Sequence, residues 1–372
     1  MKIGVPTEVK TAERRVGLTP DSVEEVNERG HEVFIQDNAG AGAGFSNDEY
    51  KAAGATILDT AEDVYSSVDL VVKVKEPQAS ERALLRDDQT LFAYIHLAPD
   101  PDQATDLINS GSTVIAYESV VGTRGGLPLL APMSQVAGRL SVQAGARCLE
   151  APVGGRGVLL GGVPGVAPAS VAVIGGGVVG RHATEMAVGL GAHVTVLDRS
   201  VEVLETFSQR YGPAVRTQYS NHATVHASVV GADLVIGAVL VPGAKAPHLV
   251  TAAMLKEMNP GSVLVDVAID QGGCCETSKA TTHTDPTYVV DDVVHYCVAN
   301  MPGAVPRTST QALNNATLPY LLKIVDQGPI DAMRSDAGLR AGLTVYEGKI
   351  TEPAVAQALN TDYHSPDEVL AA

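Results

Sequence analysis

The chain has 372 residues, of which 45% are hydrophobic, and its 26 basic and 43 acidic side chains give a formal net charge of −17. This length suits two domains of ordinary size, each with its own core. The negative charge argues against nucleic acid as a partner, and the sequence lacks the roughly 18–20 consecutive apolar residues of a membrane span. A globular protein with neither a nucleic-acid nor a membrane partner is therefore expected.

The N-terminus and the cysteines indicate the compartment. The first residues, MKIGVPTEVK, begin a strand directly and show no signal peptide. Of the four cysteines, Cys274 and Cys275 are adjacent, which makes a poor framework for disulfides. A reduced, cytoplasmic protein is predicted.

Strands and helices alternate along the first third of the chain, which predicts a parallel, doubly wound α/β sheet. The expected strands cover residues 2–5, 31–36, 69–74, 89–97 and 113–117. The expected helices cover residues 21–30, 48–53 and 101–110. In the first of these helices, Asp21 is the expected N-cap after Pro20, and Gly30 is the expected stop.

A second α/β unit is expected from about residue 170 to residue 300, and it also has the alternation of a doubly wound sheet. Two long helical patterns, 134–149 and about 310–325, flank this unit and would carry the chain out of the first domain and back. The expected strands cover residues 171–174, 193–197, 234–239, 263–269 and 296–300.

These patterns predict two α/β domains. A central Rossmann domain, residues 131–307, would be inserted into a discontinuous domain made of residues 1–130 and 308–372. The glycine-rich stretch 154–165 lacks a following Lys-Ser/Thr pair, so it is not a phosphate-binding P-loop and is expected to form a hairpin.

The segment VAVIGGGVVG contains the pattern G-x-G-x-x-G as Gly175, Gly177 and Gly180. The first glycine allows a tight turn out of a strand, the second lets the backbone approach a pyrophosphate, and the third lets the helix pack closely on the strand. The helix that follows would point its free N–H groups at the phosphates. The pattern predicts dinucleotide binding, and a glycine-rich structural turn is the alternative.

Asp198 ends the next expected strand, HVTVLD, where a carboxylate can accept hydrogen bonds from the adenosine ribose and repel a 2′-phosphate. This position favours NAD over NADP, although the adjacent Arg199 weakens the argument.

Arg15 follows the first strand, in TAERRVGLTP, and Lys75 ends the strand DLVVKVKEP. Open α/β sheets bind ligands at the carboxyl ends of their strands, and the planar fork of arginine matches a carboxylate. Alternation would place Lys73 on the same face as Lys75. The structural alternatives are a solvated Arg15 and an exposed lysine pair beside Glu76.

His96 ends the strand TLFAYIHLAP, and a histidine can act as general acid and base near neutral pH. Asp270 ends VLVDVAID, where its carboxylate would face a crevice from the cofactor side. A structural histidine and a turn aspartate are the alternatives, and Asp266, within the same strand, is expected to make structural contacts. Asn300 is expected beside a nicotinamide. His283 and the adjacent cysteines match no standard zinc spacing, so no metal is predicted.

Together, the motifs MKIGVPTEVKTAERRVGLTP, DLVVKVKEP, LFAYIHLAP, VIGGGVVG, VDVAIDQGGCCETS and VANMPGAVPRTSTQALNNATLPY make the chain resemble the alanine dehydrogenases over essentially its whole length. The resemblance implies a catalytic N-terminal domain, a central NAD domain, a homohexamer, and reversible oxidative deamination of L-alanine to pyruvate and ammonia. It makes His96 and Asp270 the catalytic pair, and Arg15 and Lys75 the residues that hold the substrate carboxylate or keto oxygen.

The resemblance also implies a set of residues around NAD. In addition to the three glycines, the set is Ser134, Val178, Val179, Asp198, Ser220, Val239, Leu240, Val267, Ala268, Ile269, Asp270, Lys279, Val298, Ala299, Asn300 and Met301. Lys279 stands where relatives often have arginine, and lysine keeps the charge but loses the bidentate fork. This departure bears on how tightly the cofactor is expected to bind, and not on which cofactor is expected.

Within this scheme His96 is expected to do most of the proton transfer, while Asp270 orients water or ammonia; the two roles are also open to exchange. Two other functions share part of the pattern: a dehydrogenase of a larger amino acid, such as lysine or saccharopine, and a nucleotide-binding module like that of a proton-pumping transhydrogenase. The presence of both His96 and Asp270 counts against the module.

Overall fold

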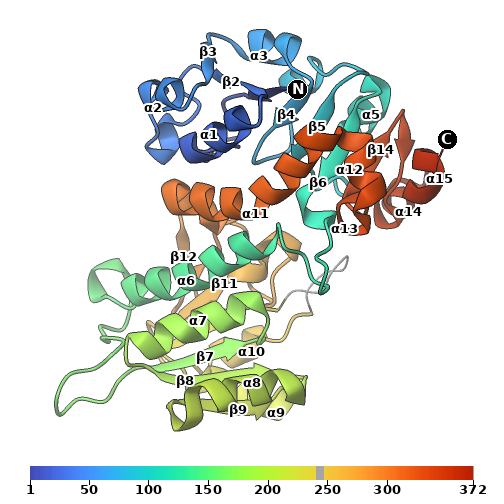
Figure 1. Ribbon diagram of the computed structural model, residues 1–372. Coiled ribbons are helices and arrows are strands. Elements are labelled where there is room, and N and C mark those ends of the chain that lie inside the picture. Colours follow the sequence, from blue (N-terminus) through green and yellow to red (C-terminus); the bar gives the residue numbers. More distant parts are fainter. Residues whose placement is uncertain (240–246, 372) are drawn as a thin grey trace. The chain divides into compact units, whose positions relative to one another are not determined.

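The computed structural model describes residues 1–239 and 247–371, without the side chains of residues 270 and 271. The chain forms two compact units. Unit 1 consists of Met1–Met133 and Val305–Ala372, and unit 2 consists of Ser134–Ala304. Figure 1 shows the elements of each unit, which are described in turn.

Unit 1 is built on an eight-stranded sheet. Its strands are β1 (Lys2–Val5), β2 (Glu32–Gln36), β3 (Thr56–Leu58), β4 (Leu70–Val72), β5 (Thr90–Ala93), β6 (Thr113–Ala116), β14 (Leu343–Tyr346) and β15 (Lys349–Ile350). Their order is β15-β14-β6-β5-β4-β1-β2-β3, in which β1 to β6 are parallel and β14 and β15 are antiparallel. The chain reverses its direction across the sheet between β1 and β4, so this pair is the switch point where doubly wound sheets bind ligands.

Helices surround this sheet, and Tyr65, Leu91 and Val114 belong to the core beneath them. The helices are α1 (Pro20–Glu28), α2 (Asn47–Ala52), α3 (Ala61–Ser67), α4 (Ala79–Arg82), α5 (Pro101–Ser110), α11 (Pro306–Gln327), α12 (Pro329–Ser335), α13 (Ala337–Arg340), α14 (Pro353–Leu359) and α15 (Pro366–Ala371). Short 3-10 turns are η1 (Ala41–Ala43) and η2 (Tyr117–Ser119).

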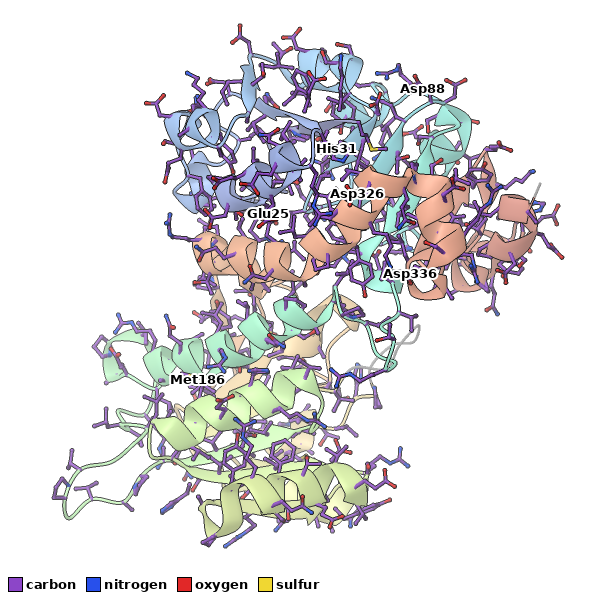
Figure 2. The ribbon with its side chains drawn as sticks, in the orientation of Figure 1. Glu25, His31, Asp88, Met186, Asp326 and Asp336 are labelled. Atoms are coloured by element: carbon purple, nitrogen blue, oxygen red, sulfur yellow. The ribbon has the colours of Figure 1, made fainter. Side chains whose placement is uncertain are left out.

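Helix α11 ties the two separate segments of unit 1 together. Asn314 accepts the N–H of Thr19 at 2.8 Å and donates to the carbonyl of Gly17 at 2.8 Å, and both hydrogen bonds are buried. At the other end of the helix, Asp326 lies beside His31, with an Oδ1–Nε2 distance of 3.2 Å (Figure 2). The late segment is therefore part of the fold that positions the loops of the N-terminal segment.

Unit 2 is built on a seven-stranded sheet. Its strands are β7 (Ser170–Ile174), β8 (His193–Asp198), β9 (Val215–Tyr219), β10 (Leu234–Gly237), β11 (Val263–Asp266), β12 (Thr287–Val290) and β13 (Val293–Tyr296). The order is β12-β13-β11-β10-β7-β8-β9, and only the pairing of β12 with β13 is antiparallel among the described strands. The six parallel strands follow the Rossmann order, with the switch point between β7 and β10.

The helices of unit 2 cover this sheet, and Ile174, Val229 and Leu264 belong to the core beneath them. The elements are α6 (Ala131–Cys148, which begins in unit 1), η3 (Ala151–Val153), α7 (Val178–Gly189), α8 (Val201–Tyr211), η4 (Gly212–Ala214), α9 (His222–Val230), α10 (Ala252–Leu255), η5 (Val267–Gln271) and η6 (Met301–Ala304). Helices α6 and α7 lie side by side (Figure 1): a Cβ on Gly138 would stand 2.3 Å from the carbonyl oxygen of Val179.

The predicted α/β class with two doubly wound sheets is confirmed, but several boundaries differ from the expectation. Helix α1 begins at Pro20, and its N-cap is Thr19, whose Oγ1 accepts the N–H of Ser22 at 3.3 Å. The predicted cap at Asp21 was wrong because proline fits the first helical position, which moves the cap one residue upstream.

The strands that precede candidate residues end earlier than predicted. β4 ends at Val72 and β5 at Ala93, although the N–H of Tyr94 still donates to the carbonyl of Val74 at 3.2 Å. β11 ends at Asp266, because this residue caps η5. The strand predicted at 296–300 was wrong: β13 is Val293–Tyr296, and the apolar residues that follow lie in a loop that is buried without being a strand.

Candidate functional site

The glycine turn of unit 2 has the geometry that each of its three glycines requires. Gly175 has φ +103°, and a Cβ there would stand 2.6 Å from the carbonyl oxygen of Ala238. A Cβ on Gly180 would stand 1.8 Å from the carbonyl oxygen of Gly175, so only glycine lets α7 pack this closely on β7. A Cβ on Gly177 would meet nothing within 4 Å, which leaves open space beside the backbone.

Gly177 is also the N-cap of α7 and has no side chain to satisfy the first N–H groups of the helix. Free N–H groups at a helix N-terminus, with the positive end of the helix dipole, form an anion site. A pyrophosphate fits this arrangement because the approach over Gly177 is open. The residues present therefore fit a dinucleotide.

Asp198 holds the glycine turn in place from the end of β8. Its Oδ2 accepts the N–H of Gly176 at 2.7 Å, and its Oδ1 accepts the N–H of Ser200 at 2.8 Å. Ser220, at the end of β9, donates its N–H to the Asp198 carbonyl at 2.8 Å. A carboxylate is thus fixed beside the turn, a position from which it would disfavour the 2′-phosphate of NADP.

Other residues expected around NAD lie at the same edge of this sheet, because parallel strands end there together. The register pairs Gly237 of β10 with Ile174 of β7 and with Asp266 of β11. Val239 follows β10, Val267, Ala268 and Ile269 form η5 after β11, and Val298, Ala299, Asn300 and Met301 follow β13.

The remaining predicted NAD residues differ in how the structure places them. Ser134 is half-buried in α6, and Lys279 is exposed and donates its N–H to the hydroxyl of Tyr288 at 2.7 Å. Leu240 lies outside the described residues. The backbone of Asp270 belongs to η5, but its side chain lies outside the description.

Asp266, expected to be structural, is a fully buried hub that closes the loop containing Asp270. Its Oδ1 accepts the N–H of Ala268 at 3.1 Å, and its Oδ2 accepts the N–H of Cys274 at 2.9 Å and the hydroxyl of Ser278 at 2.6 Å. One carboxylate thus joins the start and the end of the loop after β11.

In unit 1, Arg15 is buried rather than solvated, with only 1% of its side chain exposed. Its Nε donates to Glu13 Oε1 at 2.7 Å and its Nη2 to Glu13 Oε2 at 2.5 Å, while its Nη1 lies 3.0 Å from the sulfur of Met133. Burial acts to lower the pKa of Arg15, but the hydrogen bond to Glu13 and the charges around the guanidinium, that of Glu13 first, together keep that pKa raised. Glu13, which the sequence analysis missed, fixes the guanidinium plane.

Lys73 and Lys75 differ in environment, so the alternative of an exposed lysine pair was wrong. Lys73 is fully buried and contacts Glu8 and Glu81, whereas Lys75 is half-buried. Burial acts to lower the pKa of Lys73, but the two carboxylates keep it raised. The alternation argument failed because β4 ends at Val72, before either lysine.

His96 lies in the loop after β5 with φ +46°, a left-handed conformation that is uncommon for residues other than glycine. Glu118 of η2 holds it: Oε1 accepts the His96 N–H at 2.5 Å and lies 3.5 Å from its Nδ1. The imidazole stacks on Tyr94, with ring centroids 5.8 Å apart, and remains 44% exposed. Sequence reasoning missed Glu118 because no motif marks it.

The structure brings the three unit-1 candidates to one edge of a sheet. Arg15, Lys75 and His96 lie in the loops after β1, β4 and β5, which are neighbours in the sheet. Tyr94 connects two of these loops, because it stacks on His96 and interacts electrostatically with Arg15. Two cations and an accessible imidazole at a switch point suit a small carboxylate and a proton transfer.

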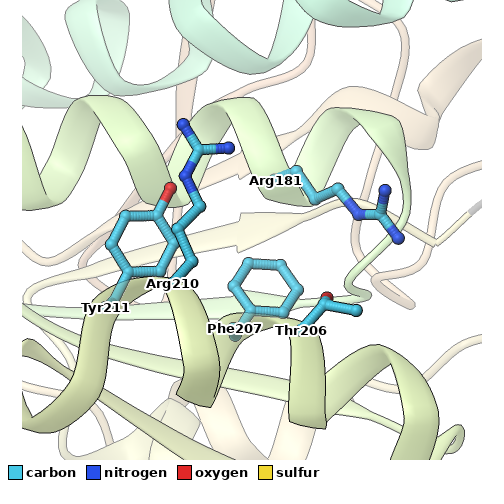
Figure 3. A pocket seen from close by; sticks show the side chains of 5 residues that line it. All are labelled: Arg181, Thr206, Phe207, Arg210 and Tyr211. Atoms are coloured by element: carbon cyan, nitrogen blue, oxygen red, sulfur yellow. The ribbon is translucent and has the colours of Figure 1, made fainter.

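A pocket of about 110 Å³ lies on a different part of unit 2, between α7 and α8 (Figure 3). It is lined by Arg181, Thr206, Phe207, Arg210 and Tyr211. Figure 3 shows the two guanidinium groups extending in different directions, and Arg210 pairs with Glu185 at 3.2 Å. This volume is below the 300 Å³ or so of ordinary ligand sites, so the pocket does not suit a dinucleotide.

Among the described residues, no cluster of histidine, cysteine and acidic side chains is suited to hold a metal ion. None of the helices within residues 1–239 and 247–371 is long and apolar enough to cross a membrane.

Comparison with known proteins identifies the family. The alanine dehydrogenase/PNT N-terminal domain family matches residues 4–137, and the corresponding C-terminal domain family matches residues 141–353. The chain belongs to the alanine dehydrogenase family. Its members are NAD-dependent oxidoreductases with N-terminal and C-terminal (Rossmann) domains. The predicted family and cofactor are therefore confirmed.

Full-length relatives support this assignment. The alanine dehydrogenase of Halomonas elongata is 57% identical over 98% of each chain, and that of Mycolicibacterium smegmatis is 53% identical over the whole of both chains. A solved L-alanine dehydrogenase is 54% identical with a TM-score of 0.94, covering 97% of this chain and 99% of that one. A transhydrogenase from Sinorhizobium meliloti, 24% identical with a TM-score of 0.83, covers 94% of this chain and 100% of its own, and shares the fold.

Replacement of Gly177 by alanine tests the glycine turn. The φ of Gly177 is −67° and the space is open, so Gly177→Ala should fold normally. Its methyl group would occupy the approach to the helix N-terminus, so the Kd of NADH, measured by fluorescence titration, should rise about tenfold or more. Gly189→Ala, in the last turn of α7 and equally open, is the matched control. Equal affinities of both variants and wild type would contradict this use of the turn.

Replacement of Asp266 by asparagine tests the hub of the loop after β11. One amide oxygen cannot replace two carboxylate oxygens, so buried donors lose their acceptor and unfolding in urea should become easier by about 2–4 kcal/mol. NADH affinity should fall as well, because η5 loses its anchor. The control is Asp233→Asn, which removes an acceptor of the Ser170 N–H at 2.8 Å, before β10 and away from the loop. If both variants weaken NADH binding equally, Asp266 acts only through general stability.

Proposed function

We propose that this chain catalyses the reversible, NAD-dependent oxidative deamination of L-alanine to pyruvate and ammonia. Full-length relatives at 50–57% identity, all named alanine dehydrogenases, carry this proposal. The site of unit 1 agrees with it, because Arg15, Lys75 and His96 lie together on the loops at the switch point. A buried arginine and a half-buried lysine suit a small substrate that has one carboxylate.

We assign Arg15 and Lys75 to the substrate carboxylate or keto oxygen. Glu13 supports the role of Arg15, because two hydrogen bonds hold the guanidinium in one plane and avoid the entropic cost of ordering it on binding. A bidentate partner also makes Arg15 a fixed rather than a mobile charge.

We assign proton transfer to His96 and Asp270. Glu118 accepts the backbone N–H of His96 and lies beside its Nδ1. The imidazole is otherwise exposed and remains accessible to substrate or water. Asp270, on η5, would orient water or ammonia and balance charge. When bound, NAD accepts the hydride released from the alanine Cα. The glycine turn, the α7 N-terminus and Asp198 would hold it, together with Ser220, Lys279 and the strand-end residues described above.

Replacement of His96 by alanine tests the assignment of proton transfer. With L-alanine and NAD⁺, kcat should fall about 10²–10⁴-fold, the usual contribution of general acid–base catalysis. NADH formation is followed by absorbance, and NADP⁺ with wild type controls for cofactor choice. The Kd of NADH should stay unchanged, because the residues assigned to NAD belong to unit 2. Activity of the variant within tenfold of wild type would exclude His96 from this role. If the wild type is inactive with alanine but active with lysine or saccharopine, the proposed substrate is wrong and the larger amino acid replaces it.

We also propose that the protein is a cytoplasmic homohexamer. Burial raises the pKa of the Cys148 thiol to about 11, and each of the four cysteines is free and buried, which suits a reducing compartment. Leu159, Val163 and Val166 are 65%, 53% and 62% exposed on the extended loop before β7 (Figure 1). Apolar side chains grouped on one exposed loop support contact with another copy of the chain.

Light scattering coupled to size exclusion tests the assembly. Six chains of 38.5 kDa give an expected mass of about 231 kDa. Leu159→Asp/Val166→Asp should lower that mass, because charges would enter an apolar interface. Val201→Asp is the control: Val201 is 67% exposed at the first position of α8, where an acid is tolerated. A wild type that runs as a monomer, or an unchanged mass of the double variant, contradicts this interface.

A further inference from the structure

Three ionisable side chains are buried together where β1 and β4 end. Glu8, Lys73 and Glu81 have 2%, 0% and 3% of their side chains exposed. The Nζ of Lys73 lies 3.1 Å from Glu8 Oε2 and 2.7 Å from Glu81 Oε1. Desolvation makes such a cluster a poor source of stability, since apolar residues of similar volume often do as well. A contribution to stability therefore does not explain why three charged side chains, rather than apolar ones, occupy this place.

The second oxygen of Glu8 points to a different use. Glu8 Oε1 accepts the N–H of Val74 at 2.7 Å and the N–H of Lys75 at 3.4 Å. Glu8 comes from the loop after β1, whereas Val74 and Lys75 belong to the loop after β4. The carboxylate thus fixes the backbone at Lys75 from across the switch point of the sheet.

Glu81 holds the same loop further along. Its Oε2 accepts the N–H of Gln78, the N-cap of α4, at 2.8 Å. Lys73 contacts both carboxylates, so one buried ammonium keeps two acceptors in place on either side of Lys75. The chain from Lys73 to Gln78 is anchored at both ends.

We propose that Glu8 is a positioning residue for substrate binding: held by Lys73, it fixes the backbone of Lys75 and so directs that side chain to the substrate carboxylate or keto oxygen. The inference rests on the proposed function, which gives Lys75 its role. Because it acts through Lys75, Glu8 should affect the affinity for the substrate and leave the affinity for NADH unchanged.

Glutamine at position 8 cannot replace the carboxylate while Lys73 is present. If its amide oxygen faces the N–H groups of Val74 and Lys75, its NH₂ group faces the ammonium of Lys73. If the amide turns over, the NH₂ group faces the two N–H groups instead. Removing the ammonium as well, in Glu8→Gln/Lys73→Met, frees the amide oxygen to accept from the backbone again.

The measurement is the Kd of pyruvate for the enzyme–NADH complex, read from NADH fluorescence. Ammonia is left out, because turnover requires it. Glu8→Gln should weaken pyruvate binding about tenfold, with the Kd of NADH within twofold of wild type. Glu8→Gln/Lys73→Met should recover most of the lost affinity. A purely electrostatic role predicts the opposite sign, because removing a negative charge should strengthen binding of the pyruvate anion.

Asp336→Asn is the matched control in unit 1. Asp336 accepts the N–H groups of Gly338 and Leu339 at 2.9 and 3.0 Å and pairs with Lys323 at 2.5 Å, so it has the same kinds of partner as Glu8. It lies before α13, outside the switch-point loops (Figure 2). Its pyruvate Kd should stay within twofold of wild type.

Several results would overturn the proposal: Glu8→Gln binding pyruvate as well as wild type or better, no recovery in the double variant, or an equal loss in Asp336→Asn. If Glu8→Gln does not fold, the comparison is made between Glu8→Gln/Lys73→Met and Glu8→Ala/Lys73→Met, because these two variants differ only in the acceptor at position 8. Equal pyruvate affinities of the two variants would overturn the proposal. The proposed function fails separately, when wild type with NADH binds no pyruvate or when Lys75→Ala binds it normally.

Discussion

Hydrogen bonds from backbone N–H groups to fixed carboxylates hold the loops on which the candidate site depends. Such bonds are charge-assisted and roughly twice as strong as neutral ones, so they keep an irregular loop in one conformation. The same arrangement recurs in both units. Glu13 accepts from Arg15, Glu8 from Lys75, Glu118 from His96, Asp198 from Gly176, and Asp266 from Ala268.

This use of carboxylates has an electrostatic consequence in a chain with a net charge of −17. Acids placed beside sites for anionic groups would repel them unless each acid is neutralised locally. In unit 1, Arg15 and Lys73 pair with the acids at the strand ends, while Lys75 stays half-buried beside them. In unit 2, the α7 N-terminus offers N–H groups beside the Asp198 carboxylate, so donors suited to phosphates and an acceptor suited to ribose hydroxyls lie within one turn.

The sequence was sufficient for the parts that depend on local patterns. Alternation gave both doubly wound sheets, helix α5 was predicted at its observed bounds, and the spacing of the three glycines predicted the turn after β7. Strand ends were less predictable, because apolar residues continue past Tyr296 into a loop whose strand pairing is limited to one isolated bridge, between Val298 and Thr281. The partners of the site residues were missed: Glu8 lies 65 residues from Lys73 and Glu118 lies 22 from His96, and such pairs leave no local signal.

An acid at the end of a strand is ambiguous in sequence, and its hydrogen bonds resolve the ambiguity. A carboxylate has about four lone-pair sites, and those that accept from the backbone are not available to a substrate. Asp266 accepts from Ala268, Cys274, Cys275 and Ser278, so it is committed to holding its loop. His96 differs, because its backbone N–H bonds to Glu118 while 44% of its side chain stays exposed. These two residues therefore differ in what they can do: the buried carboxylate of Asp266 fixes its loop, whereas the imidazole of His96 remains accessible for chemistry.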